Sequence, residues 1–147
     1  MHFILPTYDN VIKIHNVALK IGGGLQGTLH EDRIHAAISR PQTFMQYDDE
    51  CDIHLVCAIL LHGLATGHAF TEGNKRTALL TVLVTYNANN TMLNFNHLMN
   101  DEYKELVLWV VAKKPHVKEI APKLKTLADK YAPNPFEAFI KHLSGKI

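Results

Sequence analysis

The sequence predicts an all-α fold that carries one small β-hairpin. Apolar residues recur at intervals of three and four along most of the 147 residues, and the residues between these segments are typical of helix caps and ends. A hydrophobic content of 47% with 20% charged residues is ordinary for a globular protein, and the length suits one hydrophobic core. We therefore expect residues 1–147 to form a single helical domain.

Four helices are expected in the first two thirds of the chain. Thr7 to Ile21 has apolar positions at helical spacing and is followed by three glycines, which end a helix. Glu31 to Ser39 should end before Pro41, because the residue before a proline disfavours the helical conformation. Asp52 to Thr66 and Asn74 to Asn87 are apolar nearly all round, so we expect both at the centre of the fold.

Three more helices are expected towards the C-terminus. Asn100 is a suitable cap for a helix over Asp101 to Lys113, although the apolar run Val107 to Val111 would equally suit a strand. Val117 to Tyr131 is amphipathic and is interrupted by a proline. Asn134-Pro135 begins a final helix, with the cap and the first-turn proline in the right order.

The expected hairpin lies between the second and third helices. Gln42 to Tyr47 contains Thr43, Phe44 and Tyr47, which favour β-structure, directly after a proline. An ordinary loop between helices explains this stretch equally well. The predicted architecture includes the hairpin.

The polar stretch from His68 to Thr77 joins the two most apolar segments and concentrates the chemistry of the chain. Its second half opens a helix, so the backbone N–H groups of Gly73, Asn74 and Lys75 should form an anion site at the positive end of the helix dipole. Lys75 and Arg76 add two charges, and an arginine fork suits phosphate oxygens. These features predict a phosphate-binding site.

Two further side chains complete a phosphate-transfer site. The carboxylate of Glu72 would repel a bound anion unless a cation lay between them, and Mg²⁺ carried by a nucleotide fits that role. His68 can take a proton from a hydroxyl nucleophile. Each residue alone has a structural explanation, such as a helix cap for Glu72 or a solvated first turn for Lys75 and Arg76. Their combination within nine residues favours a functional site.

The string His68-Ala69-Phe70-Thr71-Glu72-Gly73-Asn74-Lys75-Arg76 resembles the active-site motif of the Fic/Doc (Fido) family, His-x-Phe-x-(Asp/Glu)-Gly-Asn-(Gly/Lys)-Arg. Ser39-Arg40-Pro41-Gln42 and Leu61 to Ala65 also look like death-on-curing (Doc) toxins, so the resemblance covers roughly residues 25 to 90. It implies that His68 is the general base, that Glu72 binds Mg²⁺, and that ATP or another nucleoside triphosphate is the co-substrate. Gly73, Asn74 and Lys75 would cradle phosphates, with Arg76 neutralising the transferred group.

Two branches of the family differ in the group that they transfer. Adenylylating Fic enzymes usually carry glycine where this chain has Lys75 and a second arginine where it has Leu79, and both differences resemble Doc toxins, which transfer the γ-phosphate to a protein Ser or Thr. Gly73 instead matches the Fic pattern. Phosphotransfer is the favoured hypothesis; adenylylation and a non-catalytic binding module stay as alternatives.

The resemblance also implies partners. In the family, the position of Gln42 to Tyr47 is a flap that pairs with the target peptide, so Thr43, Phe44 and Met45 would contact the target. An elongation factor such as Tu is the suggested target of a Doc-like protein. The only Glu-Gly of the chain is Glu72-Gly73, and no inhibitory Ser/Thr-x-x-x-Glu-Gly/Asn helix accompanies it, so restraint by a separate antitoxin is expected.

Composition and spacing argue against several other functions. A net charge of +1 gives no electrostatic case for nucleic acid, and the apolar segments are too short or too interrupted to span a membrane. Two cysteines without a signal peptide indicate a cytoplasmic protein. The spacing from Gly67 to Thr77 differs from a P-loop, and no zinc-ligand spacing surrounds His62, which we interpret as a core histidine.

Overall fold

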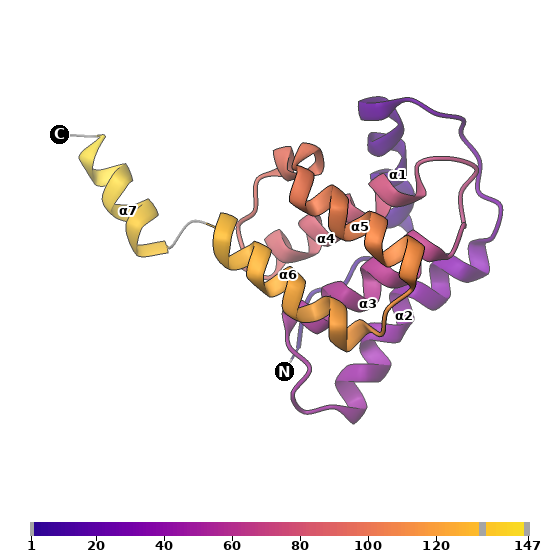
Figure 1. The fold of residues 1–147 in the computed structure, drawn as a ribbon, viewed down its shortest axis with the longest axis horizontal. Coiled ribbons are helices and arrows are strands. Elements are labelled where there is room, and N and C mark those ends of the chain that lie inside the picture. Colours follow the sequence, from indigo (N-terminus) through magenta and orange to yellow (C-terminus); the bar gives the residue numbers. More distant parts are fainter. Residues whose placement is uncertain (1, 133–134, 146–147) are drawn as a thin grey trace.

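The computed structural model describes residues 2–132 and 135–145, and it confirms the helical fold class. Figure 1 shows the helices as they follow one another along the chain. Their bounds are α1 (Tyr8–Gly22), α2 (Glu31–Tyr47), α3 (Ile53–Thr66), α4 (Asn74–Ala88), η1 (Phe95–Met99, a 3₁₀ helix), α5 (Asp101–Lys113), α6 (Val117–Tyr131) and α7 (Pro135–Ser144). Within the described residues, none of these helices is both long and apolar enough to cross a lipid bilayer.

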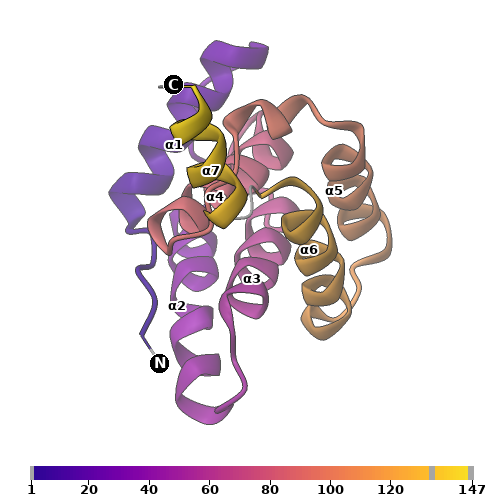
Figure 2. The ribbon, with the colours of Figure 1, turned by 90° about the vertical axis from the view of Figure 1, so that its left-hand side faces the viewer.

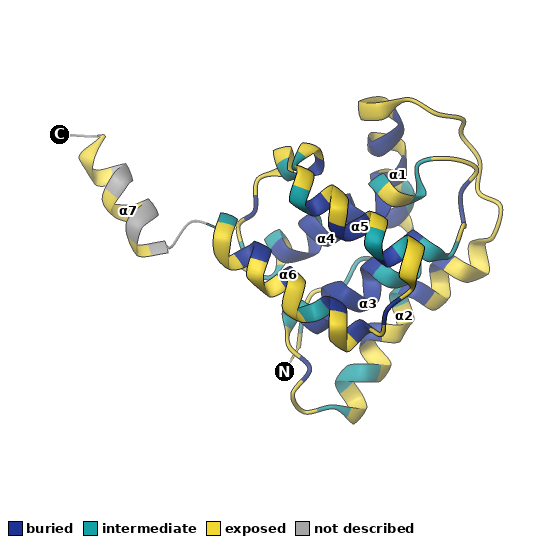
Figure 3. Cartoon of the chain, viewed as in Figure 1, coloured by how far each residue is buried: buried dark blue, intermediate teal, exposed yellow. Residues whose placement is uncertain are grey.

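Helices α3 and α4 form the centre of the molecule, as their sequences predict. Most of their residues are buried, and Figure 3 shows both as largely dark blue between more exposed neighbours. α3 packs against α2, α4, α5 and α6, whereas α4 packs against α1, α5 and η1. Thr81 and Thr85 can be buried in α4 because their hydroxyls donate to carbonyls one turn earlier. The loop between these two helices is therefore anchored at both ends in the core.

Side-chain caps fix the ends of several helices. Thr7 and Asn10 form a reciprocal capping box at the start of α1, and Asp52 accepts from the N–H of Leu55 at the start of α3. Asn100 caps α5, which confirms its predicted role. α5 is helical throughout, so the strand alternative for residues 107–111 is wrong.

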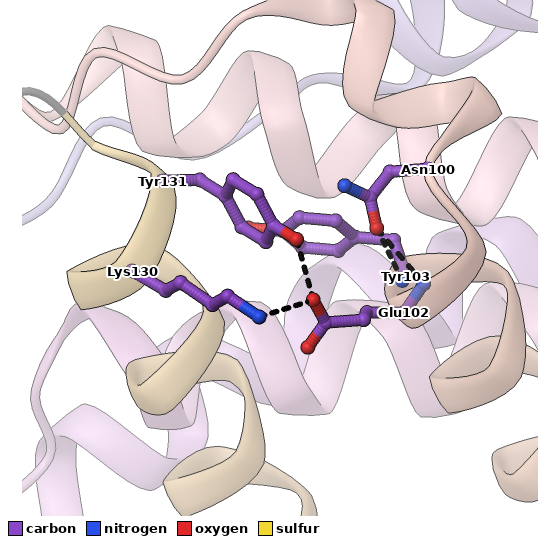
Figure 4. Close-up of polar contacts among 5 residues, drawn as sticks. All are labelled: Asn100, Glu102, Tyr103, Lys130 and Tyr131. Atoms are coloured by element: carbon purple, nitrogen blue, oxygen red, sulfur yellow. Dashed lines mark hydrogen bonds and ion pairs between the residues drawn. The ribbon is translucent and has the colours of Figure 1, made fainter.

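Helix α6 is tied to α5 by a polar cluster near its C-terminal end. The carboxylate of Glu102 accepts from the ammonium group of Lys130 at 2.6 Å and from the hydroxyl of Tyr131 (Figure 4). The hydrogen bond from Lys130 is the main reason that the pKa of Glu102 is lowered. Tyr131 also packs against the rings of His97 and Tyr103, with a centroid distance of 4.9 Å to His97. This cluster therefore places η1 and the start of α5.

The expected hairpin at Gln42 to Tyr47 is not formed. α2 continues through Pro41 to Tyr47, so Thr43, Phe44 and Met45 are helical, and the expected helix end at Ser39 is wrong. A proline inside a helix typically costs about 3 kcal/mol. Here Pro41 is buried, and Phe44 and Met45 pack against the core. Tertiary burial of this face therefore offsets the local penalty.

The final helix, α7, is present as predicted, although its expected cap, Asn134, lies outside the described residues. Figure 1 shows α7 projecting from the end of α6, away from the other helices, and in Figure 2, turned by 90°, α7 lies in front of them and faces the viewer. Among the described residues, no packing of α7 against another helix is seen.

Candidate active site

The loop over residues 67–73 is held rigidly by hydrogen bonds from two side chains outside it, Asn74 at the start of α4 and His15 of α1. The side-chain amide of Asn74 accepts from the N–H of Phe70 at 3.0 Å and donates to the carbonyl of Phe70 at 2.9 Å. Phe70 is 3% exposed and stacks on His15 with a centroid distance of 3.8 Å, and the Nε2 of His15 donates to the carbonyl of Glu72 at 2.8 Å. We call these two hydrogen bonds between the Asn74 side chain and the backbone of Phe70 the loop clamp. Because the clamp uses both the oxygen and the nitrogen of the Asn74 side chain, only the backbone N–H of Asn74 is free to face an anion.

A second chain segment, residues 25–30, runs alongside the loop. The N–H of Thr71 donates to the carbonyl of Gly27 at 3.0 Å, and the N–H of Leu29 donates to the carbonyl of Ala69 at 2.7 Å. Thr28 and Phe70 form an antiparallel bridge. The strand-like element beside the site is thus this segment. Residues 43–45, which the sequence analysis assigned to a flap, lie in α2 instead.

The sequence carries one signal for this segment, which is a pair of glycines three residues apart. Gly24 and Gly27 both have positive φ angles, of 123° and 144°, which favour glycine. A Cβ atom at Gly27 would also lie 2.6 Å from the hydroxyl oxygen of Thr71. Glycines at Gly24 and Gly27, within a short extended segment, therefore indicate close approach of two backbones.

The predicted site residues line one cavity of about 360 Å³ between the loop and α4. Ala65 and Val111 contribute its apolar part. The predicted residues that line it are His68, Glu72, Gly73, Asn74, Lys75 and Arg76. His68 is exposed and has a left-handed backbone, with a φ of 50°, which turns it out of the end of α3. The structure therefore brings together all six residues that the motif nominated.

The positive end of α4 points into this cavity. The α-helical ladder starts with the bond from the N–H of Thr77 to the carbonyl of Gly73, so the N–H groups of Asn74, Lys75 and Arg76 have no acceptor within the helix. Gly73 caps the helix with a φ of 82°. These donors and the positive end of the helix dipole face the cavity, an arrangement that suits an anion.

Glu72 and Arg76 are both held by the turn that follows α1. The Glu72 carboxylate accepts from the N–H of Leu25 at 2.9 Å. The guanidinium of Arg76 donates to the carbonyls of Ala18 at 2.9 Å and Gly23 at 3.3 Å. The two side chains that are predicted to bind metal and to neutralise charge are thus oriented by backbone groups of α1 and of the glycine-rich turn that follows it.

The donor set fits Mg²⁺ brought by a nucleotide better than a metal held by the protein alone. Within residues 2–132 and 135–145, no group of three or more His, Cys, Asp or Glu side chains is arranged to hold a metal ion. Glu72 supplies one carboxylate to the cavity. Mg²⁺ commonly binds through one or two carboxylates, substrate phosphates and water.

A second cavity of about 360 Å³ adjoins the first and shares Lys75 and Arg76 with it. Between these cations and the exposed Lys104, the walls are mainly apolar. The apolar side chains are Ile21, Leu79, Leu98, Met99, Val107 and Leu108. They come from α1, α4, η1 and α5, so no local motif in the sequence announces this cavity.

The remaining histidine and cysteine candidates are structural. Burial lowers the pKa of His62. Its Nδ1 atom has no hydrogen-bond partner among the described residues, so this core histidine lacks a hydrogen bond that a buried ring nitrogen normally makes. Cys51 and Cys57 are buried free thiols, and burial raises the pKa of both. A raised thiol pKa disfavours the reactive thiolate.

Comparison with known proteins agrees with this site. The family described as Fic/DOC matches residues 5–85, which is more than half of the chain. A curated relative, "Protein kinase doc" of Escherichia phage P1, is 33% identical over 93 residues, which cover 63% of this chain and 72% of the relative. The matched region contains the loop, the glycine-rich turn and the start of α4. The chain is a member of the Fic/DOC family.

Proposed function

We propose that this protein is a Doc-like toxin that transfers the γ-phosphate of ATP, or of another nucleoside triphosphate, to a Ser or Thr hydroxyl of a target protein. The observation that carries this proposal is the pair of adjoining cavities that share Lys75 and Arg76. One cavity is lined by the general base His68, the carboxylate of Glu72 and the N-terminus of α4. The other is lined mainly by apolar side chains.

The second cavity suits a nucleoside better than two phosphates. A terminal phosphate at the N-terminus of α4 would leave the base and ribose to extend into the apolar cavity beside Leu79. Adenylylation would place the α-phosphate at the same N-terminus, and the two outer phosphates would then have to lie along those apolar walls. Beyond Lys75 and Arg76, Lys104 is the one cation in the lining of this cavity, and desolvated charge without enough paired donors is costly. Phosphotransfer is therefore the reaction that this arrangement favours.

Gly73, the residue that favoured the adenylylating branch, has a structural explanation. Its φ of 82° lies in the left-handed region, and a Cβ atom there would lie 3.2 Å from Leu19. Glycine is therefore suited to this helix cap whichever phosphate is transferred.

In this mechanism His68 accepts the proton of the attacking hydroxyl, and the N–H groups of Asn74, Lys75 and Arg76 hold the phosphate oxygens. The side chain of Arg76 exchanges its carbonyl partners for the transferred phosphate. Glu72 would hold the Mg²⁺ of the nucleotide, which supplies positive charge to the phosphates. The loop clamp made by Asn74 keeps these groups in a fixed arrangement.

The target segment would lie along residues 25–30. This segment pairs with the active loop through Gly27 and Leu29, and its residues are exposed. An extended peptide that added to its edge would bring a hydroxyl towards His68. This segment takes the place of the flap expected at Thr43, Phe44 and Met45. The target, for which elongation factor Tu is the candidate from family resemblance, and a separate antitoxin would be this protein's partners in the cytoplasm.

The test is label transfer from ATP in bacterial lysate with Mg²⁺. We expect a protein band labelled from γ-labelled ATP, no band from α-labelled ATP, and loss of the band with His68→Ala. A Leu79→Arg variant should lower γ-transfer at least about tenfold, since it places a cation among the apolar walls. Label from the α-position in the wild type would establish adenylylation instead. Absence of both labels together with failure to bind Mg-nucleotide in calorimetry would support the non-catalytic binding module.

A further inference from the structure

The residue proposed as the base has an unusual backbone conformation. His68 has a φ of 50°, in the left-handed region that glycine favours. Among the described non-glycine residues, only Asn90 and Lys114 also have positive φ angles. A residue with a side chain disfavours this conformation, because its Cβ atom comes too close to the following carbonyl oxygen. Contacts with the surrounding structure therefore have to hold His68 in it.

The carbonyl groups on either side of His68 are held by one short stretch of chain. The guanidinium of Arg33 donates to the carbonyl of Gly67 at 2.7 Å. On the other side, the two N–H groups of residues 29–30 donate to the carbonyl of Ala69, at 2.7 Å and 3.1 Å. Arg33 is the contact in this arrangement that comes from a side chain, so it is the one that a substitution can remove.

The hydrogen bond from Arg33 acts directly on the backbone of His68. The carbonyl of Gly67 belongs to the planar peptide group that joins Gly67 to His68, so the orientation of this group sets the φ angle of His68. Gly67 follows the last residue of α3 and still has a helical backbone, with φ −75° and ψ −18°. Carbonyls at a helix C-terminus lack donors within the helix, and a cation beside them is favoured by the helix dipole. The guanidinium of Arg33 supplies both the donor and the charge.

The start of α2 places Arg33 for this contact. The N–H of Arg33 donates to the carbonyl of His30 at 3.2 Å, in the first turn of the helix. A Cβ atom at Gly67 would lie 3.8 Å from the Cβ of Arg33, so the two segments are within van der Waals contact. Arg33 lines neither of the two cavities that share Lys75 and Arg76. It can therefore act on the base without touching the nucleotide.

We propose that Arg33 is a positioning residue, which fixes the peptide group before His68 and so keeps the imidazole directed at the attacking hydroxyl. The inference rests on the proposed function only through the role of His68 as base, and it holds whether the γ- or the α-phosphate is transferred. The simpler explanation is that Arg33 only caps α3. A cap alone would change the stability of the protein and leave the rate per folded molecule unchanged.

The first experiment measures label transfer at saturating Mg-ATP, from whichever phosphate the wild type transfers, and the dissociation constant of the Mg-nucleotide by calorimetry. We expect Arg33→Ala to lower kcat per folded molecule at least about tenfold, because a displaced group slows the reaction. The affinity for Mg-nucleotide should stay within about twofold of wild type, because no binding contact is removed. Arg33→Lys keeps a cationic donor and should recover most of the rate.

Arg40→Ala is the matched control. Arg40 is the second arginine of α2 and is also exposed, and within the described part of the chain its side chain makes no hydrogen bond to the loop over residues 67–73. This variant should transfer label at the wild-type rate, and urea unfolding gives the folded fraction of each protein. Wild-type kcat in Arg33→Ala would overturn the proposal. An equal loss of rate in Arg40→Ala would also overturn it, because a general effect of charge would then explain the result.

The second experiment does not depend on activity. It compares the NMR signals of His68, and the amide hydrogen exchange of residues 29–30, between the wild type and Arg33→Ala. We expect the Cα signal of His68 to shift and the exchange to speed up at least about tenfold, while the signals of Asn74 and Lys75 stay in place. Unchanged His68 signals would overturn the proposal. If the wild type transferred no label, the proposed function would fail, and the His68 signals would still decide whether Arg33 holds this backbone.

Discussion

Replacing Gly22 by alanine should separate activity from stability. Gly22 is the last residue of α1, and the guanidinium of Arg76 lies directly over it. A Cβ atom at Gly22 would be 2.0 Å from the central guanidinium carbon of Arg76, whereas ordinary contacts begin at 3.4 Å. The guanidinium must therefore retreat, and its 2.9 Å hydrogen bond to the carbonyl of Ala18 cannot persist in its present geometry.

The expected loss of activity follows from the size of this displacement. A misplacement of about 1 Å in a catalytic group can lower a rate on the order of 100-fold, and Arg76 is the group proposed to neutralise the transferred phosphate. The change in unfolding free energy should be small. Alanine gains up to about 1 kcal/mol over glycine inside a helix, which offsets part of the lost hydrogen bond.

Rates of γ-label transfer per folded molecule, together with urea unfolding, test this expectation. Gly23→Ala is the matched control, since a Cβ atom there meets nothing within 4 Å but the residue has a φ of 75° and a ψ of −178°. That backbone strain should cost about 1–3 kcal/mol while leaving transfer within a few-fold of wild type. If Gly22→Ala transferred label at the wild-type rate, the proposed position of Arg76 during the reaction would be wrong.

Two further predictions concern stability. Asn74→Ala leaves the backbone N–H and carbonyl of Phe70 without their side-chain partner, so the free energy of unfolding in urea should fall by about 1–3 kcal/mol; an unchanged value would mean that the clamp does not stabilise the loop. Burial lowers the pKa of three histidines, so the unfolded chain binds protons that the folded chain does not, and stability should fall as pH drops through the unfolded histidine pKa of about 6.5. These histidines are His54, His62 and His97. Urea unfolding between pH 7.5 and 5.5 checks this, and a stability that rose towards pH 5.5 would contradict it.

The fold was largely predictable because its signals are local. All-round apolar sequence located α3 and α4, and Asn100 located the start of α5. The error at Pro41 has a physical cause: the rule that a proline ends a helix describes the local chain, whereas the face of α2 that includes Phe44 is buried against the core. Burial is a tertiary property that one segment of sequence does not contain.

The site was likewise predictable where its residues are contiguous in the sequence, and not where they come from distant elements. The residues from His68 to Arg76 are contiguous, so the motif alone predicted that they would form one site, and the structure places six of them around one cavity. It could not predict which group each side chain contacts. The carboxamide of Asn74 serves the loop backbone, and the apolar cavity beside Leu79 is built from four elements that are distant in sequence.

The glycine-rich turn after α1 has a more specific role than ending that helix, which is what its sequence predicts. A side chain at Gly22 would collide with Arg76, and a Cβ atom at Gly24 would lie 2.7 Å from the carboxylate of Glu72. The glycines thus let the backbone of this turn approach the two oppositely charged side chains of the site, which its carbonyls and the N–H of Leu25 then hold in place. In the proposed reaction, a nucleotide would replace these backbone contacts. The exchange is favourable for Arg76, because a phosphate offers a guanidinium a stronger, charge-assisted hydrogen bond than a neutral carbonyl does. The turn therefore preorganises both side chains, and in the proposed reaction it would release them when the nucleotide binds.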